Sequence, residues 1–210
     1  MKKFFLFLLP LVFFIESCSQ KKEEVKIISK SECDKLAFKI KNIKLDDNKY
    51  KISGIIKGKG LLYAIFRGYI NSNSKISFYT PFGKKLYSVE SVGDKTFCIK
   101  SEKEFICIDK RRFYEHFFKV SIPFKLKEII TGKFDISNIE NYKCEGDLVL
   151  FKDNNIEFVY DKNGNIKSVI FNKFKILYFW KKDNYPNLIK FYENGKYKLK
   201  LKIKTIKKVK

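Results

Sequence analysis

The sequence predicts a mainly β fold, in which a long antiparallel meander of about eleven strands has one helix at its start and one helical insertion in the middle. Three observations predict it. Apolar and polar residues alternate with a period of two through most of the chain after residue 50. Short turn signals separate these runs. One long interruption, over residues 110–132, has the signals of helices. Such a sheet either closes around a lumen or stays partly open, with helices filling its mouth.

The first helix has a clear start signal. Ser29 and Glu32 have the capping-box spacing, and apolar residues follow with the period of a helix. We therefore expect a helix over residues 30–42. After it, alternation with period two predicts the strands. Their residues are 50–57, 61–70, 75–79, 85–92, 95–100, 104–109, 147–152, 155–160, 166–171, 174–181, 188–192 and 196–206.

Two helical pieces lie inside the insertion. Asp109 is a good N-terminal cap for a helix over residues 110–119. The second piece, over residues 123–131, has Pro in its first turn and Gly132 just past its end. The chain therefore leaves the sheet once, between the sixth and seventh predicted strands.

The last hairpin has the most regular pattern. Apolar residues from Tyr197 to Ile203 alternate with lysines, which is typical of a strand with one buried and one solvated face. For Ile189 and Phe191 to join that apolar face, we expect a three-residue loop over residues 193–195, with Gly195 at positive φ.

Composition and charge fit a single folded domain. Hydrophobic residues are 45% and aromatic residues 17% of the 210, which excludes a disordered chain. The net charge is +22, yet only three basic residues are Arg (Arg67, Arg111 and Arg112). The charge therefore fits either a polyanionic partner or a solvated surface shaped by codon bias.

The first twenty residues have the pattern of an export signal. Two lysines precede an apolar run over residues 4–15, which as a helix spans about 18 Å, short of the roughly 30 Å core of a bilayer. We expect residues 1–17 to be a signal peptide that is removed. The Ile-Glu-Ser-Cys sequence ending at Cys18 resembles a bacterial lipobox, which implies lipidation of Cys18 and a lipidated tether over residues 18–28. The alternative is a soluble secreted protein.

Export would place four further cysteines in an oxidising compartment. When the two runs around residues 101–104 are paired as a hairpin, Cys98 lies opposite Cys107 at a non-hydrogen-bonded position, close enough for a disulfide. We therefore predict Cys98–Cys107 and, by elimination only, Cys33–Cys144. Buried free thiols are the alternative.

Large apolar side chains mark the predicted inner face of the sheet. In such a barrel they either form a plain core or line a hydrophobic cavity. The candidates are Ile65, Ile76, Phe78, Leu86, Phe97, Ile99, Phe158, Tyr178, Trp180, Phe191 and Leu199.

Motifs for catalysis and cofactor binding are missing from the sequence. It has no Gly-x-Ser-x-Gly, phosphate-loop or His-Glu-x-x-His pattern. His116 is the only histidine, so sites that need two histidines are excluded. We expect no enzyme, no catalytic residue, no metal and no cofactor, and a binding protein instead.

Four short motifs resemble, in the same order, those of the LolA/LolB lipoprotein-localisation superfamily, most closely its LolB-like outer-membrane receptors. They cover nearly the whole chain after the predicted signal. They are Leu62-Tyr63-Ala64-Ile65-Phe66, then Thr80-Pro81-Phe82-Gly83, then Ser121-Ile122-Pro123 with Leu126, Ile130 and Gly132, and last Tyr185-Pro186-Asn187-Leu188 through Asn194-Gly195 to the Lys198–Ile203 strand.

The resemblance implies an unclosed antiparallel β-barrel with a helical lid, formed by one domain over residues 29–210. It implies that acyl chains of lipoproteins, or another lipid, pass from a periplasmic LolA-like carrier through the cavity to the outer membrane. It implies a membrane-delivery loop at Pro81, Phe82 and Gly83, and a lid that includes Phe117, Phe118, Leu126 and Ile130.

Two resemblances imply a location. Ser19 and Gln20 follow Cys18 without an Asp in second place, and resemblance to enterobacterial lipoprotein sorting signals then favours the outer membrane. The LolB-like resemblance implies a lipid-anchored monomer there that faces the periplasm. Export disfavours nucleic acid as a partner. Two alternatives stay open: a lipid or glycolipid carrier of the same fold, and a basic surface scaffold or adhesion lipoprotein that binds anionic lipid or polysaccharide.

Overall fold

The computed structural model describes residues 29–43, 46–58, 63–71, 73–93, 95–118, 122–181 and 184–209. The expected signal peptide, Cys18 and the tether lie outside the described residues. So do Leu62 and Ser121, and the side chains of His116, Phe117 and Phe118.

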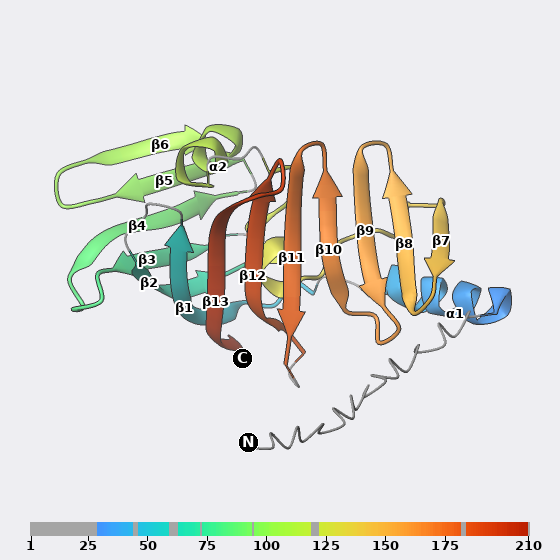
Figure 1. The fold of residues 1–210 in the computed structure, drawn as a ribbon. Helices are drawn as coiled ribbons and strands as arrows, with labels where there is room; N and C mark the ends of the chain where they lie inside the picture. Colours follow the sequence, from blue (N-terminus) through green and yellow to red (C-terminus); the bar gives the residue numbers. More distant parts are fainter. Residues whose placement is uncertain are drawn as a thin grey trace, which may run out of the picture.

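The described chain forms one sheet of thirteen antiparallel strands with three helices (Figure 1). The strands are β1 (Tyr50–Gly58), β2 (Ala64–Ile70), β3 (Lys75–Tyr79), β4 (Lys85–Val92), β5 (Thr96–Lys100), β6 (Phe105–Asp109), β7 (Tyr142–Glu145), β8 (Leu148–Asp153), β9 (Ile156–Asp161), β10 (Ile166–Phe171), β11 (Phe174–Trp180), β12 (Pro186–Glu193) and β13 (Lys196–Lys208). The helices are α1 (Lys30–Lys41), α2 (Lys110–Phe118) and α3 (Leu126–Thr131).

The strand order shows that the sheet is not closed. It runs β6-β5-β4-β3-β2-β1-β13-β12-β11-β10-β9-β8-β7, so β6 and β7 are the two edges. Neighbours in the sheet are neighbours in sequence, except that β1 pairs with β13. The predicted unclosed antiparallel fold is therefore confirmed.

The chain passes from one edge of the sheet to the other through a single connection, residues 110–141, which carries α2 and α3 (Figure 1). We call this segment the crossover. Because α2 lies against β5 and β6 while α3 lies against β12, the crossover spans one face of the sheet, which we call the inner face.

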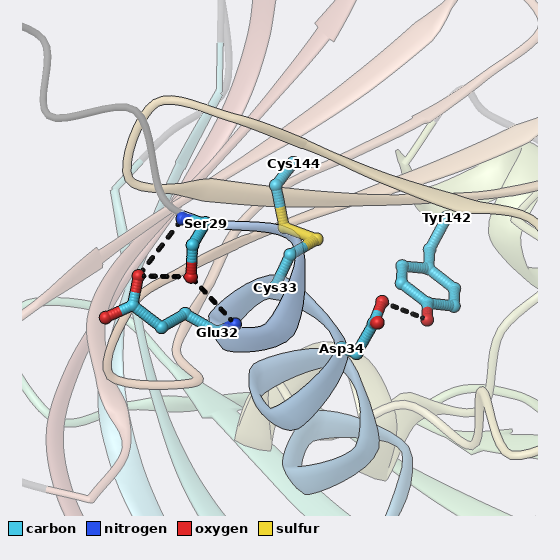
Figure 2. Close-up of a disulfide and its surroundings, with 6 residues drawn as sticks. All are labelled: Ser29, Glu32, Cys33, Asp34, Tyr142 and Cys144. Atoms are coloured by element: carbon cyan, nitrogen blue, oxygen red, sulfur yellow. Dashed lines mark hydrogen bonds between the residues drawn. A yellow bond between two sulfur atoms is a disulfide. The ribbon is translucent and has the colours of Figure 1, made fainter.

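Helix α1 has the predicted N-terminal cap and packs against β7 and β8, at the β7 edge of the sheet (Figure 2). The Ser29 side chain accepts from the Glu32 N–H, and the Glu32 carboxylate accepts from the Ser29 N–H. Cys33 is joined to Cys144 of β7, with Cα atoms 6.0 Å apart, and Tyr142 of β7 donates to Asp34 at 2.8 Å. The sequence analysis missed β7, a short polar strand that these two contacts tie to α1.

The β5–β6 hairpin has the predicted register. Phe97 pairs with Ile108, Cys98 with Cys107, and Ile99 with Ile106. The two cysteines form a disulfide with Cα atoms 4.0 Å apart.

The β12–β13 hairpin differs from the expected loop. Asn194 and Gly195 both have positive φ and form a two-residue turn, because Glu193 already pairs with Lys196. A β-bulge between Phe191 and Tyr192 then restores the register, so Phe191 still pairs with Leu199. The expected faces are correct, while the three-residue loop is wrong.

Helix α3 begins at Leu126, three residues later than predicted. Ile122 and Phe124 are buried, and a short extended stretch lets both side chains reach the core. Lys125 is the N-cap residue, and its N–H donates to the Glu128 carboxylate at 2.7 Å. Gly132, with φ of 67°, is the C-cap residue.

Candidate functional site

The candidate site is the inner face of the sheet together with the crossover that covers it. Nine of the eleven expected inward residues belong to the hydrophobic core or pack against it. The fully buried ones are Ile76, Phe97, Phe158, Tyr178, Phe191 and Leu199, and the half-buried ones are Phe78, Ile99 and Trp180.

Ile65 and Leu86 do not lie on this face. Ile65 sits between Ala64 and Phe66, which are buried, and alternation places it on the opposite face of β2. Leu86 is the extra residue of a β-bulge between β3 and β4, and it is 39% exposed. In this segment the bulge broke the period-two pattern on which the expectation depended.

Aromatic side chains of the crossover fill the space above β8 to β11. Phe124 contacts Phe134 at 5.0 Å between ring centroids, and both rings also contact Phe158 of β9. Phe134 further meets Tyr178 of β11 at 6.1 Å. The inner face is therefore packed with side chains of the crossover, and the apolar interior is covered.

Helix α2 covers the other half of the inner face. Phe113 stacks on Phe97 of β5 at 4.2 Å, and Tyr114 meets both rings edge-on. Of the expected lid residues, Leu126 is half-buried against the core and Ile130 is buried. Sequence reasoning missed the buried crossover residues Phe124, Phe134, Ile136 and Ile139, which are single large apolar side chains without a regular period.

A polar centre lies beneath α3. Burial raises the pKa of the Glu128 carboxyl, although the Lys125 N–H and the positive charges of Lys125 and Lys110 oppose the shift. Burial also raises the pKa values of Tyr160 and Tyr178 well above the ordinary value, and the charge of Glu128 adds to both shifts. The Tyr178 hydroxyl is buried without a hydrogen-bond partner among the described residues. The interior thus offers a buried hydroxyl to a ligand that carries an acceptor.

Lys127 ties α3 to Asp46, in the segment just before β1. Its side chain is only 8% exposed, its Nζ donates to the Asp46 carbonyl oxygen, and the Asp46 carboxylate lies 3.7 Å from the same nitrogen. The Tyr50 hydroxyl donates to Asp46 at 2.7 Å. Burial raises the pKa of Asp46, but the hydrogen bonds with Tyr50 and Asn48 and the charge of Lys127 together outweigh it, so the pKa lies below its ordinary value.

A small opening leads between α2 and α3. Its volume is about 120 Å³, and Ser74, Lys110 and Lys127 are among the residues that line it. Sites for small molecules usually have roughly 300–1,000 Å³. The opening is therefore too small for an acyl chain unless the crossover moves.

The turn between β3 and β4 presents Phe82 to solvent. Thr80 accepts from the Gly83 N–H to close this turn, and Gly83 has φ of 86°. Phe82 is 99% exposed, the highest value among the large apolar side chains that the structure describes. Phe105, 68% exposed, begins β6 just after the β5–β6 turn, which projects from the same end of the sheet (Figure 1).

No protein-family model and no curated protein sequence matches the chain. Among solved structures, the comparison found a LolA superfamily protein from Nitrosomonas europaea with a TM-score of 0.54 and 10% sequence identity, covering 85% of this chain and 94% of that one. The two chains share a fold. A DUF1329 family protein from Desulfovibrio piger has a TM-score of 0.49 and 12% identity, with 85% and 92% of the two chains covered.

None of the helices in the described part of the chain is long and apolar enough to cross a bilayer. The described residues contain no group of three or more His, Cys, Asp or Glu that could hold a metal ion.

Proposed function

We propose that this protein is a LolB-like lipoprotein of the outer membrane, anchored through Cys18 and facing the periplasm, which accepts the acyl chains of lipoproteins and delivers them to that membrane. The observation that carries the proposal is the crossover, an apolar segment that covers the inner face and joins the two edges of an open sheet. A segment tied at both ends leaves the face and returns to it without unfolding the sheet.

The inner face has the chemistry that hydrocarbon requires. The crossover rings Phe124 and Phe134 pack on Phe158 and Tyr178, so an acyl chain that replaced them would meet the same apolar surface. Apolar contact is nondirectional and roughly proportional to area, so one apolar occupant exchanges for another at small net cost. Transfer of this kind requires no nucleotide and no catalytic residue.

Polar contacts hold the crossover closed. Lys127 anchors α3 to Asp46, just before β1. A hydrogen bond to a charged group contributes about 1.5–3 kcal/mol. Loss of this one contact therefore favours the open state without breaking strand pairs.

Phe82 fits the role of a delivery residue. A fully exposed Phe at the tip of a turn gains roughly 1.5–3 kcal/mol when it enters lipid, which favours the membrane and remains reversible. Lys84 and Lys85 follow it, and each basic residue near an anionic surface contributes about 1 kcal/mol.

The test uses the full chain with Cys18→Ser. The first measurement is binding of the fluorescent fatty acid cis-parinaric acid. The second is transfer of a lipoprotein from a carrier to anionic vesicles. We expect the wild-type interior to bind the probe, and Phe82→Glu to keep probe binding while it loses delivery to vesicles. Phe38→Glu is the matched control, because Phe38 is 71% exposed on α1, away from that turn.

Two results would contradict the proposal. Absence of probe binding by the wild type, together with absence of lipid in mass spectra of the purified protein, would exclude an acyl carrier. Equal delivery by Phe82→Glu and Phe38→Glu would remove the β3–β4 turn from the mechanism.

A further inference from the structure

The opposite face of the sheet carries a second site, independent of the proposed acyl transfer. An open groove of about 580 Å³ crosses β1, β2 and β3 beside β13. Its walls contain Lys51, Ser53, Arg67, Lys75, Ser77 and Thr205. None of these residues belongs to the hydrophobic core, and no described helix covers them.

Hydroxyl groups and one guanidinium form a row along the groove. Ser53 of β1 pairs with Thr205 of β13 on one side and with Arg67 of β2 on the other, and Arg67 pairs with Ser77 of β3. Paired residues of neighbouring strands point to the same face. Ser53 Oγ and Thr205 Oγ1 lie 2.7 Å apart. Four hydrogen-bonding side chains thus stand in one line across four strands.

The next row on the same face is basic. Lys51 pairs with Tyr69, and Tyr69 pairs with Lys75. Glu90 is 2.5 Å from the Lys75 ammonium, whereas Arg67 and Lys51 have no acidic partner among the described residues. Several positive charges close together, with one acid at the β4 end of the row, produce a strong local attraction for an anion.

Arg67 is held in place by an aromatic ring. Its guanidinium lies 5.8 Å from the centroid of the Tyr79 ring. The planar fork of Arg matches the geometry of phosphate and binds it through two parallel hydrogen bonds. The hydroxyls of Ser53 and Ser77, on either side of Arg67, supply further donors to the remaining oxygens.

We propose that this groove binds the phosphate group of a phosphorylated ligand, with Arg67 as the main contact, Ser53 and Ser77 as hydroxyl donors, and Lys51 as a second positive charge. A phosphomonoester carries close to two negative charges and three acceptor oxygens, which suits this set of donors better than a carboxylate does. The phosphate belongs either to a soluble sugar phosphate or to a lipid headgroup.

The test measures binding of glucose 6-phosphate, glucuronate and glucose to the full chain by calorimetry. We expect glucose 6-phosphate to bind more tightly than glucuronate, and glucose not to bind. Arg67→Gln should weaken the phosphate complex about tenfold. The matched control is Lys152→Gln, which removes the same charge from an exposed site on β8. Ser53→Ala with Ser77→Ala removes the flanking hydroxyls without a change of charge and should also weaken binding.

A second arm distinguishes the sources of the phosphate. Vesicles with and without phosphatidic acid are compared for Arg67→Gln and Lys152→Gln. Arg67-dependent binding to phosphatidic acid assigns the site to a lipid headgroup, and Arg67-dependent binding of the sugar phosphate alone assigns it to a soluble ligand. Equal losses in the two variants, or glucuronate binding as tight as glucose 6-phosphate, would overturn the proposal, because the attraction would then come from overall charge.

Discussion

The ammonium group of Lys127, on the buried side of α3, lies 3.7 Å from the carboxylate of Asp46, just before β1. Eighty-one positions of sequence separate the two residues. The same ammonium lies 5.6 Å from the centroid of the Tyr50 ring. The Lys127 ammonium therefore connects the crossover to the segment before β1, near the centre of the sheet. A substitution of Lys127 is the most direct way to weaken the closed state.

Replacement of this cation should loosen α3. Lys127→Met keeps the length and burial of the side chain but removes the hydrogen bond to Asp46, so we expect the amides of α3 to exchange about tenfold faster, equivalent to about 1.4 kcal/mol. Hydrogen exchange read by mass spectrometry measures this. Lys152→Met on β8 is the control, and unchanged exchange in α3 would show that Lys127 does not hold the crossover.

The buried negative charge of Glu128 should lower the free energy of unfolding at neutral pH. Burial raises the pKa of its carboxyl in the folded state. The protonated Glu128 carboxyl therefore contributes stability that is fully present when the pH is below its pKa in the unfolded chain. This contribution is lost as the pH rises through its higher pKa in the folded chain. Gln keeps the acceptor for the Lys125 N–H without the charge. We expect Glu128→Gln to be more stable than wild type at pH 7.

Urea unfolding of both proteins at pH 7 and at about pH 4 checks this prediction. Other titrating groups are common to the two proteins, so they cancel in the difference. The advantage of Glu128→Gln should shrink as the pH falls. A difference that stays constant with pH would mean that the Glu128 charge is not buried in the closed state.

The two disulfides should differ in what they contribute. Cys33–Cys144 spans 111 positions and Cys98–Cys107 spans 9. The chain-entropy model gives about 5 kcal/mol for the long loop and about 3 kcal/mol for the short one. We expect Cys33→Ser with Cys144→Ser to lower the free energy of unfolding more than Cys98→Ser with Cys107→Ser. The opposite order in urea unfolding would contradict this account.

Phe134 should be the most sensitive residue of the crossover. Its side chain is 2% exposed and contacts Phe124, Phe158 and Tyr178. Phe134→Ala should lower the free energy of unfolding by about 3–5 kcal/mol, because it leaves a cavity in the interior. Phe179→Ala is the control, since Phe179 lies on the exposed face of β11. Thermal unfolding of the two variants is the measurement, and similar losses would mean that the interior is loosely packed.

Local patterns predicted the hairpins well. Alternation over residues 95–109 gave the register of β5 and β6, including the Cys98–Cys107 pair, because a short turn leaves few alternatives for strands that each have one buried face. The same logic failed at Leu86, where a bulge changes the face, and at Tyr142–Glu145, a short strand without an apolar period.

Periodicity and capping between residues close in the chain are enough to predict the antiparallel meander, the start of α1 and the apolar inner face. Two features could be seen only in the folded chain. The sheet joins at β1 and β13, which brings Ser53 beside Thr205 from 152 positions away, and the crossover fills the interior. Both depend on contacts between distant segments. Periodicity reports which face of an element is apolar, but the partner that covers that face is set by packing of the whole chain.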